Sequence, residues 1–347
     1  MNAPSAPAAA SSTPTPVPAA ERPSSADFDA VAHGGAYAVL PQFGVIEANG
    51  DDAATFLHGQ LTNDIQHLEV AGARLAGYCS AKGRLLASFL TWRTGDAIRL
   101  LVSKDVQAAV QKRLSMFVLR AKAKLTDASD ALLVVGLAGD VRRALATQFE
   151  ALPDGVHVSI DGPSGTLIRV PDAAGRLRYL WIGPKAAVEA GLASLDGALR
   201  RVPPAVWDWL DIRAGEPRIT QPASEQFVPQ MVNYDVLGGV NFRKGCYPGQ
   251  EVVARSQYRG TIKRRTSLAS VAVDLAAAAP GAELFHSDDP GQPCGMIVNA
   301  AAAPDGGVDL LAELKLAALE SGTVHLGAAD GPVLRILPLP YALPSEA

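Results

Sequence analysis

The stretch from Asn241 to Glu251 holds the residues of this chain that are most suited to chemistry. It reads Asn-Phe-Arg-Lys-Gly-Cys-Tyr-Pro-Gly-Gln-Glu, and two glycines and a proline within five residues predict a tight loop. Such a loop presents the thiol of Cys246 beside Lys244 instead of burying it. The alternative is a small apolar cysteine that fills a gap in a core, which is the more common role of a free cysteine.

Good helix formers follow this loop from Glu251 onward, so the sequence places Cys246 just before the N-terminus of a helix. The positive end of the helix dipole and the ammonium group of Lys244 would both favour the thiolate form of the cysteine. The thiolate is the form that acts as a nucleophile. We therefore interpret Cys246 and Lys244 as the candidate catalytic residues.

The string Lys-Gly-Cys-Tyr-x-Gly-Gln-Glu at 244–251, followed by Ala254-Arg255, resembles the defining motif of the YgfZ family of folate-binding proteins. This family is related to the glycine-cleavage T-protein. The likeness extends to the segments 60–64, 81–84 and 227–230, and covers nearly everything from 36 to about 340. It implies an α+β fold in which three domains form a T-protein-like ring around a folate cavity, with a ferredoxin-like middle domain and a C-terminal β-barrel.

The resemblance also assigns residues to a folate site, with tetrahydrofolate or a one-carbon-substituted folate as the cofactor. Two tryptophans flank the folate in the family, and by position they fall on Phe43 and Trp207. Phe43 departs from the pattern but still offers an aromatic face for stacking. Trp207 has the alternative of a core or interdomain residue. From the motif itself, the resemblance assigns Tyr247, Gln250 and Glu251 to the same site.

Polar side chains elsewhere are further candidates for the folate site. The amides of Gln60 and Asn63 suit the donor and acceptor edges of a pterin, and loop capping is the open alternative. Asn233 and Asp235 are interpreted as facing the cavity, with a role in turns as their alternative. Arg255, near a run of three basic residues, either attracts the glutamate carboxylates of a folate or belongs to a solvated face.

The resemblance, together with these residues, implies three possible functions. The first is a tetrahydrofolate-binding protein that supports the assembly or repair of iron–sulfur enzymes, with Cys246 as a reactive thiol near the folate. The second is a folate-dependent aminomethyltransferase, which has no need of a loop cysteine. The third is a factor in folate-linked tRNA modification, against which the net charge of −4 speaks. The expected partners are folate, iron–sulfur enzymes or their assembly machinery and, with weaker support, tRNA.

The amino-acid composition limits which folds, sites and cellular locations are compatible with this sequence. A chain of 347 residues with 48% hydrophobic and 19% charged residues is predicted to fold into two or three domains. Its three cysteines lie far apart, and its six histidines show no ligand spacing, so the sequence predicts no metal site and gives the histidines no role. No apolar run reaches the length of a membrane span, and no secretory signal is present. We expect a monomer in the bacterial cytoplasm.

Apolar periodicity predicts the elements that must position these residues. The run Tyr37–Asn49 alternates like a single strand, and Lys82-Gly83 predicts a hairpin turn between strands at 74–80 and 85–93. Ser103 is predicted to cap a helix. The apolar stripe of that helix consists of Val106, Val110, Leu114 and Phe117.

The order of these elements divides the chain into five segments. Residues 1–26, rich in Ala, Pro, Ser and Thr, are predicted to be a disordered tail. Residues 27–130 form an N-terminal α+β folate-binding domain, and 131–200 a ferredoxin-like domain with a β-α-β-β order followed by a helix and a strand. Residues 201–260 return to the folate cavity with the cysteine motif, and the Gly-rich, strand-rich residues 261–347 form the β-barrel.

Overall fold

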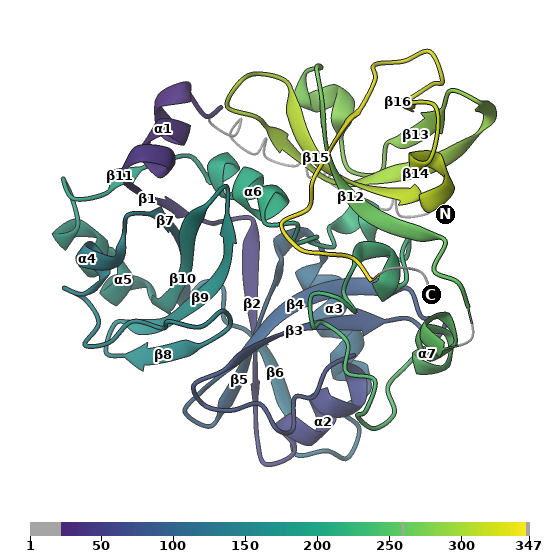
Figure 1. Cartoon of the computed structure of the whole chain (residues 1–347). Coiled ribbons are helices and arrows are strands. Elements are labelled where there is room, and N and C mark those ends of the chain that lie inside the picture. Colours follow the sequence, from purple (N-terminus) through teal and green to yellow (C-terminus); the bar gives the residue numbers. More distant parts are fainter. Residues whose placement is uncertain (1–21, 259, 345–347) are drawn as a thin grey trace, which may run out of the picture.

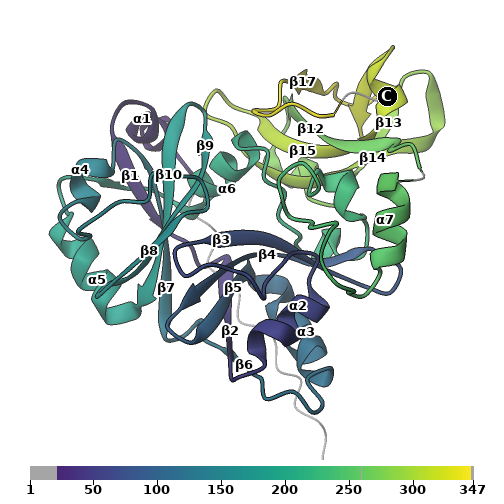
Figure 2. The ribbon, with the colours of Figure 1, turned by 60° about the horizontal axis from the view of Figure 1, so that its bottom comes forward.

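Three β-sheets organise the residues that the computed structural model describes, which are 22–258 and 260–344 (Figure 1). One sheet comes from the N-terminal part of the chain, one mostly from the middle and one from the C-terminal part. The three sheets surround helix α6 (Pro204–Arg213), which lies near the centre of the molecule (Figure 2).

The first sheet is antiparallel and has the strand order β3-β4-β5-β2-β6. Its strands are β2 (Phe43–Asn49), β3 (Ala73–Cys79), β4 (Leu85–Thr94), β5 (Ala97–Ser103) and β6 (Lys124–Asp127). Helices α2 (Ala53–Gln60) and α3 (Lys104–Met116) cover one face, where Phe56 and Val106 pack against Ile46 and Phe89. The first eight residues of β4 are all buried, because its other face looks toward the centre of the molecule.

Two local predictions for this sheet are confirmed. Strands β3 and β4 form a hairpin whose turn contains Gly83 at a φ of 71°, a conformation that favours glycine. Helix α3 buries Val106, Val110 and Leu114 as its periodicity predicts. The fourth member of the stripe, Phe117, is 45% exposed because the helix ends at Met116. Among the described residues, no helix combines the length and the apolar character that a membrane crossing requires.

The second sheet has the strand order β11-β1-β7-β10-β9-β8. Its strands are β1 (Gly35–Val39), β7 (Leu132–Gly139), β8 (Ser159–Gly162), β9 (Gly165–Ala173), β10 (Arg176–Pro184) and β11 (Arg200–Arg201). Helices α4 (Arg142–Leu145) and α5 (Lys185–Ser194) pack on one face, where Leu145 and Val188 contact the layer that contains Trp181. The other face turns toward α6.

The predicted division of the chain at residue 130 does not separate these two sheets. The single strand predicted over Tyr37–Asn49 is two strands, and Pro41, which has no backbone N–H to donate, lies in the turn between them. Strand β2 joins the first sheet, whereas β1 pairs with β7 and β11 in the second. The segment from 131 has the order β7-α4-β8-β9-β10-α5-β11, with three strands between its two helices, and β1 from outside it lies between β7 and β11 in the sheet.

The third sheet is antiparallel, has the order β16-β13-β14-β15-β12-β17 and curls strongly (Figures 1 and 2). Its strands are β12 (Arg264–Val271), β13 (Glu283–His286), β14 (Asp289–Ala302), β15 (Val308–Lys315), β16 (Val324–Leu326) and β17 (Arg335–Leu337). Two short 3₁₀ helices, η3 (Leu275–Ala278) and η4 (Leu316–Leu319), connect them. The β-barrel predicted from the sequence is thus a strongly curled sheet, in which residues 332–334, directly before β17, hydrogen-bond back to β16 at the opposite edge.

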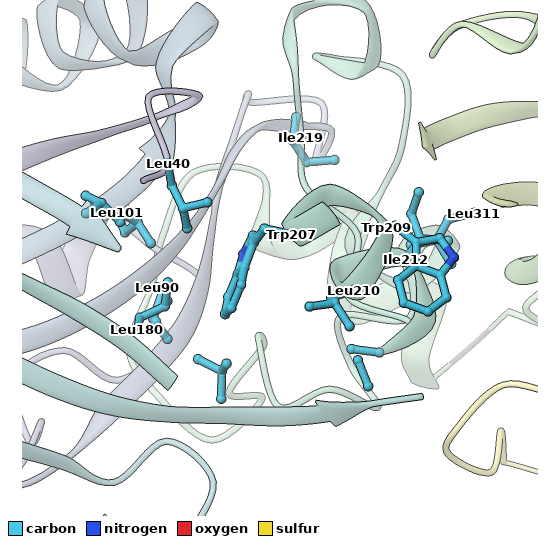
Figure 3. Packing of buried hydrophobic residues seen from close by; sticks show 14 of the residues in the cluster. Leu40, Leu90, Leu101, Leu180, Trp207, Trp209, Leu210, Ile212, Ile219 and Leu311 are labelled. Carbon is cyan, nitrogen blue, oxygen red and sulfur yellow. The ribbon is translucent and has the colours of Figure 1, made fainter. Parts of the chain in front are cut away.

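Helix α6 buries side chains around most of its circumference. Figure 3 shows Trp207 on the side of Leu90 and Leu180, and Trp209 on the side of Leu311. The indole N–H of Trp209 donates a hydrogen bond of 2.9 Å to Asp309 on β15. This helix therefore joins the third sheet to the other two. The segment after it carries two 3₁₀ helices, η1 (Gln221–Ala223) and η2 (Pro229–Val232), and then helix α7 (Gln250–Tyr258).

Helix α1 (Ser25–His33) begins inside the predicted tail, whose first 21 residues lie outside the described part of the chain. The carboxylate of Asp27 accepts hydrogen bonds from the backbone N–H and the hydroxyl of Ser24, at 2.9 and 2.7 Å. This Ser-x-x-Asp spacing marks a helix start. The ring of Phe28 packs edge-on against Trp209 with centroids 5.2 Å apart. The end of the predicted tail is therefore a capped helix on the core.

Candidate functional site

A cavity at the centre of the molecule is enclosed by the first and second sheets, α6 and the segment that follows it. Its volume is about 80 Å³, which is smaller than the roughly 300–1,000 Å³ of typical small-molecule sites. Its polar and aromatic lining residues are Phe43, Ser88, Phe89, Ser103, His157, Trp207, Asp211, Glu216, Arg218 and Tyr234.

Two predicted folate-binding residues, Phe43 and Trp207, line this cavity although they lie far apart in the sequence. The guanidinium of Arg218 lies over the ring of Phe43, 4.7 Å from its centroid. Trp207 is only 3% exposed, and a methyl group built on Gly136 would overlap its ring. Trp207 is therefore a core residue as well as part of the cavity wall.

A cluster of charged side chains forms the polar side of the cavity. Arg178 is completely buried and donates hydrogen bonds to Asp211 at 2.6 Å and to Glu216 at 2.7 Å. Its guanidinium also lies 4.8 Å from the ring centroid of Trp207. Burial raises the pKa of Asp211 to about 6, against the lowering effect of Arg178 and Arg218. Burial likewise raises the pKa of Glu216.

Sequence reasoning missed this cluster. The sequence signal for this cluster was the presence of charged residues in an otherwise apolar helix. Charged groups are rarely buried without partners, so such residues point to buried ion pairs. Helix α6 and the next five residues carry Asp208, Asp211 and Arg218 among side chains such as Trp209 and Leu210. Their partner Arg178 lies on β10, and no local pattern connects it to them.

Three buried polar atoms on the cavity wall make no hydrogen bond within the described residues. They are Nε and Nη1 of Arg218 and Nε2 of His157. Arg218 uses its remaining Nη2 in a hydrogen bond of 2.8 Å to Asp208. Buried donors without partners are rare in proteins and often mark a place where a ligand or water binds. The Nη1 atom of Arg218 also lies 3.7 Å from a carboxylate oxygen of Asp211, an ion pair without a hydrogen bond. The cavity therefore offers an aromatic ring, buried carboxylates and guanidinium donors without hydrogen bonds to a polar aromatic ligand.

The predicted loop of Cys246 and Lys244 has the expected position before a helix, because α7 begins at Gln250. Cys246 is exposed, whereas Cys79 and Cys294 are buried. Neither Cys246 nor Lys244 belongs to the cavity wall. Their loop lies in the segment between α6 and α7, directly before α7 begins.

Lys244 anchors this loop. Its ammonium donates hydrogen bonds to the carbonyl oxygens of His58 and Leu61, the latter at 2.8 Å, at the C-terminal end of α2. It also lies 4.9 Å from the ring centroid of Tyr247. Burial lowers the pKa of Lys244 to about 8, although the nearby Asp64 and Cys246 oppose this shift. The lysine is thus a structural anchor as well as a positive charge close to the thiol.

Two glycines bring the cysteine loop against the β3–β4 turn. Gly249 has a φ of 78°, and a methyl group built on it would lie 2.6 Å from the Cα of Gly83. A methyl group built on Gly83 would in turn lie 2.8 Å from the Cβ of Val252 on α7. The two sequence motifs at 81–84 and 244–251 are therefore in direct backbone contact, which only glycine permits.

The predicted folate-binding residues Gln60 and Asn63 do not line the cavity. The amide of Asn63 donates to the carbonyl oxygens of Leu75 and Gly238, each at 2.7 Å, and its own oxygen accepts from the N–H of Asp64. The first two bonds connect Asn63 to strand β3 and to the turn at Gly238, and the third is local to its own turn. These bonds favour the loop-stabilising alternative, and a contact of Asn63 with a pterin stays a prediction. Gln60 has a buried side-chain oxygen without a hydrogen bond among the described residues.

Asn233 and Asp235 are also engaged elsewhere. Asn233 is buried at a φ of 58° and donates hydrogen bonds to the carbonyl oxygen of Thr266, at 2.8 Å, and to the hydroxyl of Tyr341, at 3.2 Å. Asp235 forms a buried, two-bond ion pair with Arg265 at 2.6 and 2.9 Å. Neither residue lines the cavity, and both hold the third sheet against the returning segment. Their assignment to the folate site stays a prediction.

The other residues predicted to bind folate lie on α7 or in the loop before it, and none of them lines the cavity. Tyr247 is buried beneath the loop, and Gln250 begins the helix. Arg255 and Glu251 form an exposed pair one helical turn apart, at 2.7 Å, beside a shallow surface hollow that also includes Tyr258. The structure therefore places these residues near Cys246 and not at the cavity.

The sequence assigned no role to the histidines, but Asp64 brings two of them together. The Nδ1 atoms of His58 and His67 lie 3.0 and 2.9 Å from the two carboxylate oxygens of Asp64. His58 is at the end of α2, beside the anchored Lys244. Sequence spacing could not find this pair, because the two histidines meet through a turn instead of along a helix.

Comparison with known proteins places the chain among relatives. No family model matches it. A tRNA-modifying protein YgfZ of Sodalis glossinidius (strain morsitans) is 31% identical over 306 residues, which cover 88% of this chain and 92% of the relative. Proteins of the same name from Serratia proteamaculans (strain 568) and Edwardsiella ictaluri (strain 93-146) are 33% identical over 321 residues and 34% identical over 300 residues. The matches cover 88% and 86% of this chain, and 92% and 89% of the relatives, respectively.

Among solved structures, the glycine cleavage system aminomethyltransferase T of Bartonella henselae matches with a TM-score of 0.72. It is 16% identical, and the match covers 89% of this chain and 86% of the transferase. At that identity the match shows a common fold only. The sequence relatives are closer and span nearly the whole chain. The chain therefore belongs to the YgfZ family, with the fold of the glycine-cleavage T-protein.

Proposed function

We propose that this protein binds tetrahydrofolate in the central cavity and acts in tRNA modification. The observation that carries the folate assignment is the joint presence of Phe43, Trp207 and buried donors of Arg218 without hydrogen bonds on one cavity wall. The relatives named tRNA-modifying protein YgfZ support the second part.

The wall residues fit a pterin in chemical terms. Phe43, which is only partly buried, offers a ring face for stacking. The carboxylates of Asp211 and Glu216 accept hydrogen bonds from amino and ring N–H groups, and the remaining N–H groups of Arg218 donate to a carbonyl oxygen. When bound, a tetrahydrofolate supplies a carrier for a one-carbon unit. The chain's own part is to bind the ring, orient it and shield it from water.

Titration with tetrahydrofolate is expected to quench tryptophan fluorescence in the parent protein, because the ligand would lie against Trp207. The Trp207→Phe variant is expected to lose this quenching. Trp92→Phe serves as the matched control, since Trp92 is fully buried but does not line the cavity. Phe43→Ala should weaken binding by about tenfold, the order of one aromatic contact. Unchanged quenching in Trp207→Phe together with unchanged affinity in Phe43→Ala would place the ligand elsewhere.

We further propose that the protein supports iron–sulfur enzymes, including those that modify tRNA, and that Cys246 is the reactive thiol in this role. The exposure of Cys246 and its anchored loop support the proposal. An aminomethyltransferase would not need the thiol. Replacing the sulfur atom of Cys246 therefore distinguishes the two functions.

In cells that carry Cys246→Ser in place of the parent, we expect reduced activity of iron–sulfur enzymes and undermodified tRNA, measured by mass spectrometry of nucleosides. Serine is nearly isosteric and Cys246 is exposed, so the fold should persist. Cys294→Ala, at a buried cysteine of the third sheet, is the control and should leave both readouts unchanged when its expression matches. Full activity of the Cys246→Ser variant would show that the loop is structural.

A further inference from the structure

Asp64 is a permanently ionised group beside the cysteine loop. Burial raises the pKa of Asp64, but hydrogen bonds from His67 and the charges of His67 and His58 outweigh this and lower it to about 2. Its carboxylate is therefore negative at neutral pH and acts only as a hydrogen-bond acceptor. The ring nitrogen that faces it on each histidine must carry the proton.

His58 is held in one tautomer by this carboxylate. Burial lowers the pKa of His58, and the charge of Lys244 lowers it further, while Asp64 acts in the opposite direction. The imidazole is thus neutral at pH 7, with its single proton on Nδ1 toward Asp64. Its other nitrogen, Nε2, carries a free lone pair and makes no hydrogen bond to any described residue.

That free nitrogen faces the cysteine loop. A methyl group built on Gly245 would lie 3.6 Å from Nε2 of His58, and no other atom outside the loop comes within 4 Å of that position. Gly245 has no side chain to cover the imidazole, and it directly precedes the exposed Cys246. Neighbouring Cα atoms are about 3.8 Å apart, so the backbone of Cys246 lies close to this nitrogen.

We propose that His58 is the base that accepts the proton of the Cys246 thiol, with Asp64 as the residue that positions and charges the imidazole. The proton moves from Sγ to Nε2, and the electron pair of the S–H bond stays on the sulfur. The ionised Asp64 stabilises the imidazolium, and Lys244 lies beside the thiolate. This inference rests on the part of the proposed function that makes Cys246 a reactive thiol.

The rate at which iodoacetamide alkylates Cys246 tests the proposal, measured from pH 5.5 to 9 with the site resolved by mass spectrometry. The charged groups that face the pair are Asp64, His67 and Lys244. In His58→Gln we expect a loss of about tenfold or more near pH 6.5, the lower range of acid–base assistance. The parent and variant rates should converge near pH 9, where hydroxide removes the proton without a base.

His33→Gln is the matched control, because His33 is an exposed histidine at the C-terminal end of α1 and takes no part in the cluster of Asp64 with His58 and His67. Its pH profile should follow the parent. Equal loss in His58→Gln at every pH would indicate a change in access, and superimposed profiles would indicate no role; either result overturns the proposal. The measurement contains no folate, so its failure leaves the test of the folate site intact.

A second measurement does not depend on the folding of a His58 variant. Coupled groups shift one another's titration, so the thiolate of the parent should favour the imidazolium. The His58 ring, followed by NMR in the Cys246→Ser protein, is expected to titrate at a lower pH than in the parent. An identical titration in the two proteins would contradict proton transfer between the residues.

Discussion

Replacing Arg178 with alanine is expected to lower the free energy of unfolding by about 3–5 kcal/mol, the cost of removing one partner from a buried ion pair. Arg178 has no exposed surface and holds two carboxylates, Asp211 and Glu216, at 2.6 and 2.7 Å. Without the guanidinium, the carboxyl groups of Asp211 and Glu216 stay close together in the buried wall of the cavity and lose the positive charge that they share. Urea unfolding at pH 8 measures the loss.

The loss should also depend on pH in a defined direction. The pKa of Asp211 is raised to about 6 in the folded protein, from 3.8 when exposed, so its contribution to stability is fully present below pH 3.8 and is lost as the pH rises through 6. Removal of Arg178 raises the pKa of Asp211 further, since that charge lowers it. We therefore expect a smaller loss at pH 5, where protonation neutralises the carboxyl, than at pH 8.

Arg142→Ala is the matched control. Arg142 also binds a carboxylate, that of Asp154 at 3.0 Å, but the two side chains are 48% and 82% exposed. Exposed pairs contribute less than about 1 kcal/mol. A loss in Arg178→Ala no larger than in Arg142→Ala, or equal losses at pH 5 and pH 8, would show that the buried cluster does not hold the cavity wall.

Local patterns in the sequence predicted the helices and strands well, but they did not predict which strands pair with one another. The β3–β4 hairpin and the buried stripe of α3 follow from residues close together in the chain, where turn chemistry and periodicity act. The insertion of β1 into the second sheet depends on pairing with β7, about a hundred residues away. No periodicity within either strand records that pairing.

The candidate site shows the same division. Phe43 and Trp207 were found through a family resemblance and do line one cavity. The amide of Asn63, by contrast, binds strand β3 and the turn at Gly238, and a sequence motif does not distinguish that role from ligand binding. The cluster of Arg178 with Asp211 was missed because each charge, taken alone in the sequence, is indistinguishable from a surface residue.

Replacing Gly249 with alanine is expected to lower the free energy of unfolding by about 2–5 kcal/mol. A left-handed backbone costs an L-residue about 1–2 kcal/mol, and Gly249 has a φ of 78°. The added methyl group would also overlap the backbone of the β3–β4 turn at Ser80 and Gly83, and overpacking costs about 1–3 kcal/mol more. Chemical unfolding, followed by circular dichroism, measures the sum.

Gly95→Ala separates the two causes. Gly95 lies in the turn between β4 and β5 at a φ of 55°, and a methyl group built there meets no atom within 4 Å. Its loss should therefore be only the backbone cost of about 1–2 kcal/mol. The overlap at Gly249 should in addition displace the loop, release Lys244 from the end of α2 and change the alkylation rate of Cys246, whereas Gly95→Ala should leave that rate unchanged. Equal destabilisation in the two variants, with an unaltered Cys246, would mean that the contact between the two glycine motifs does not position the thiol.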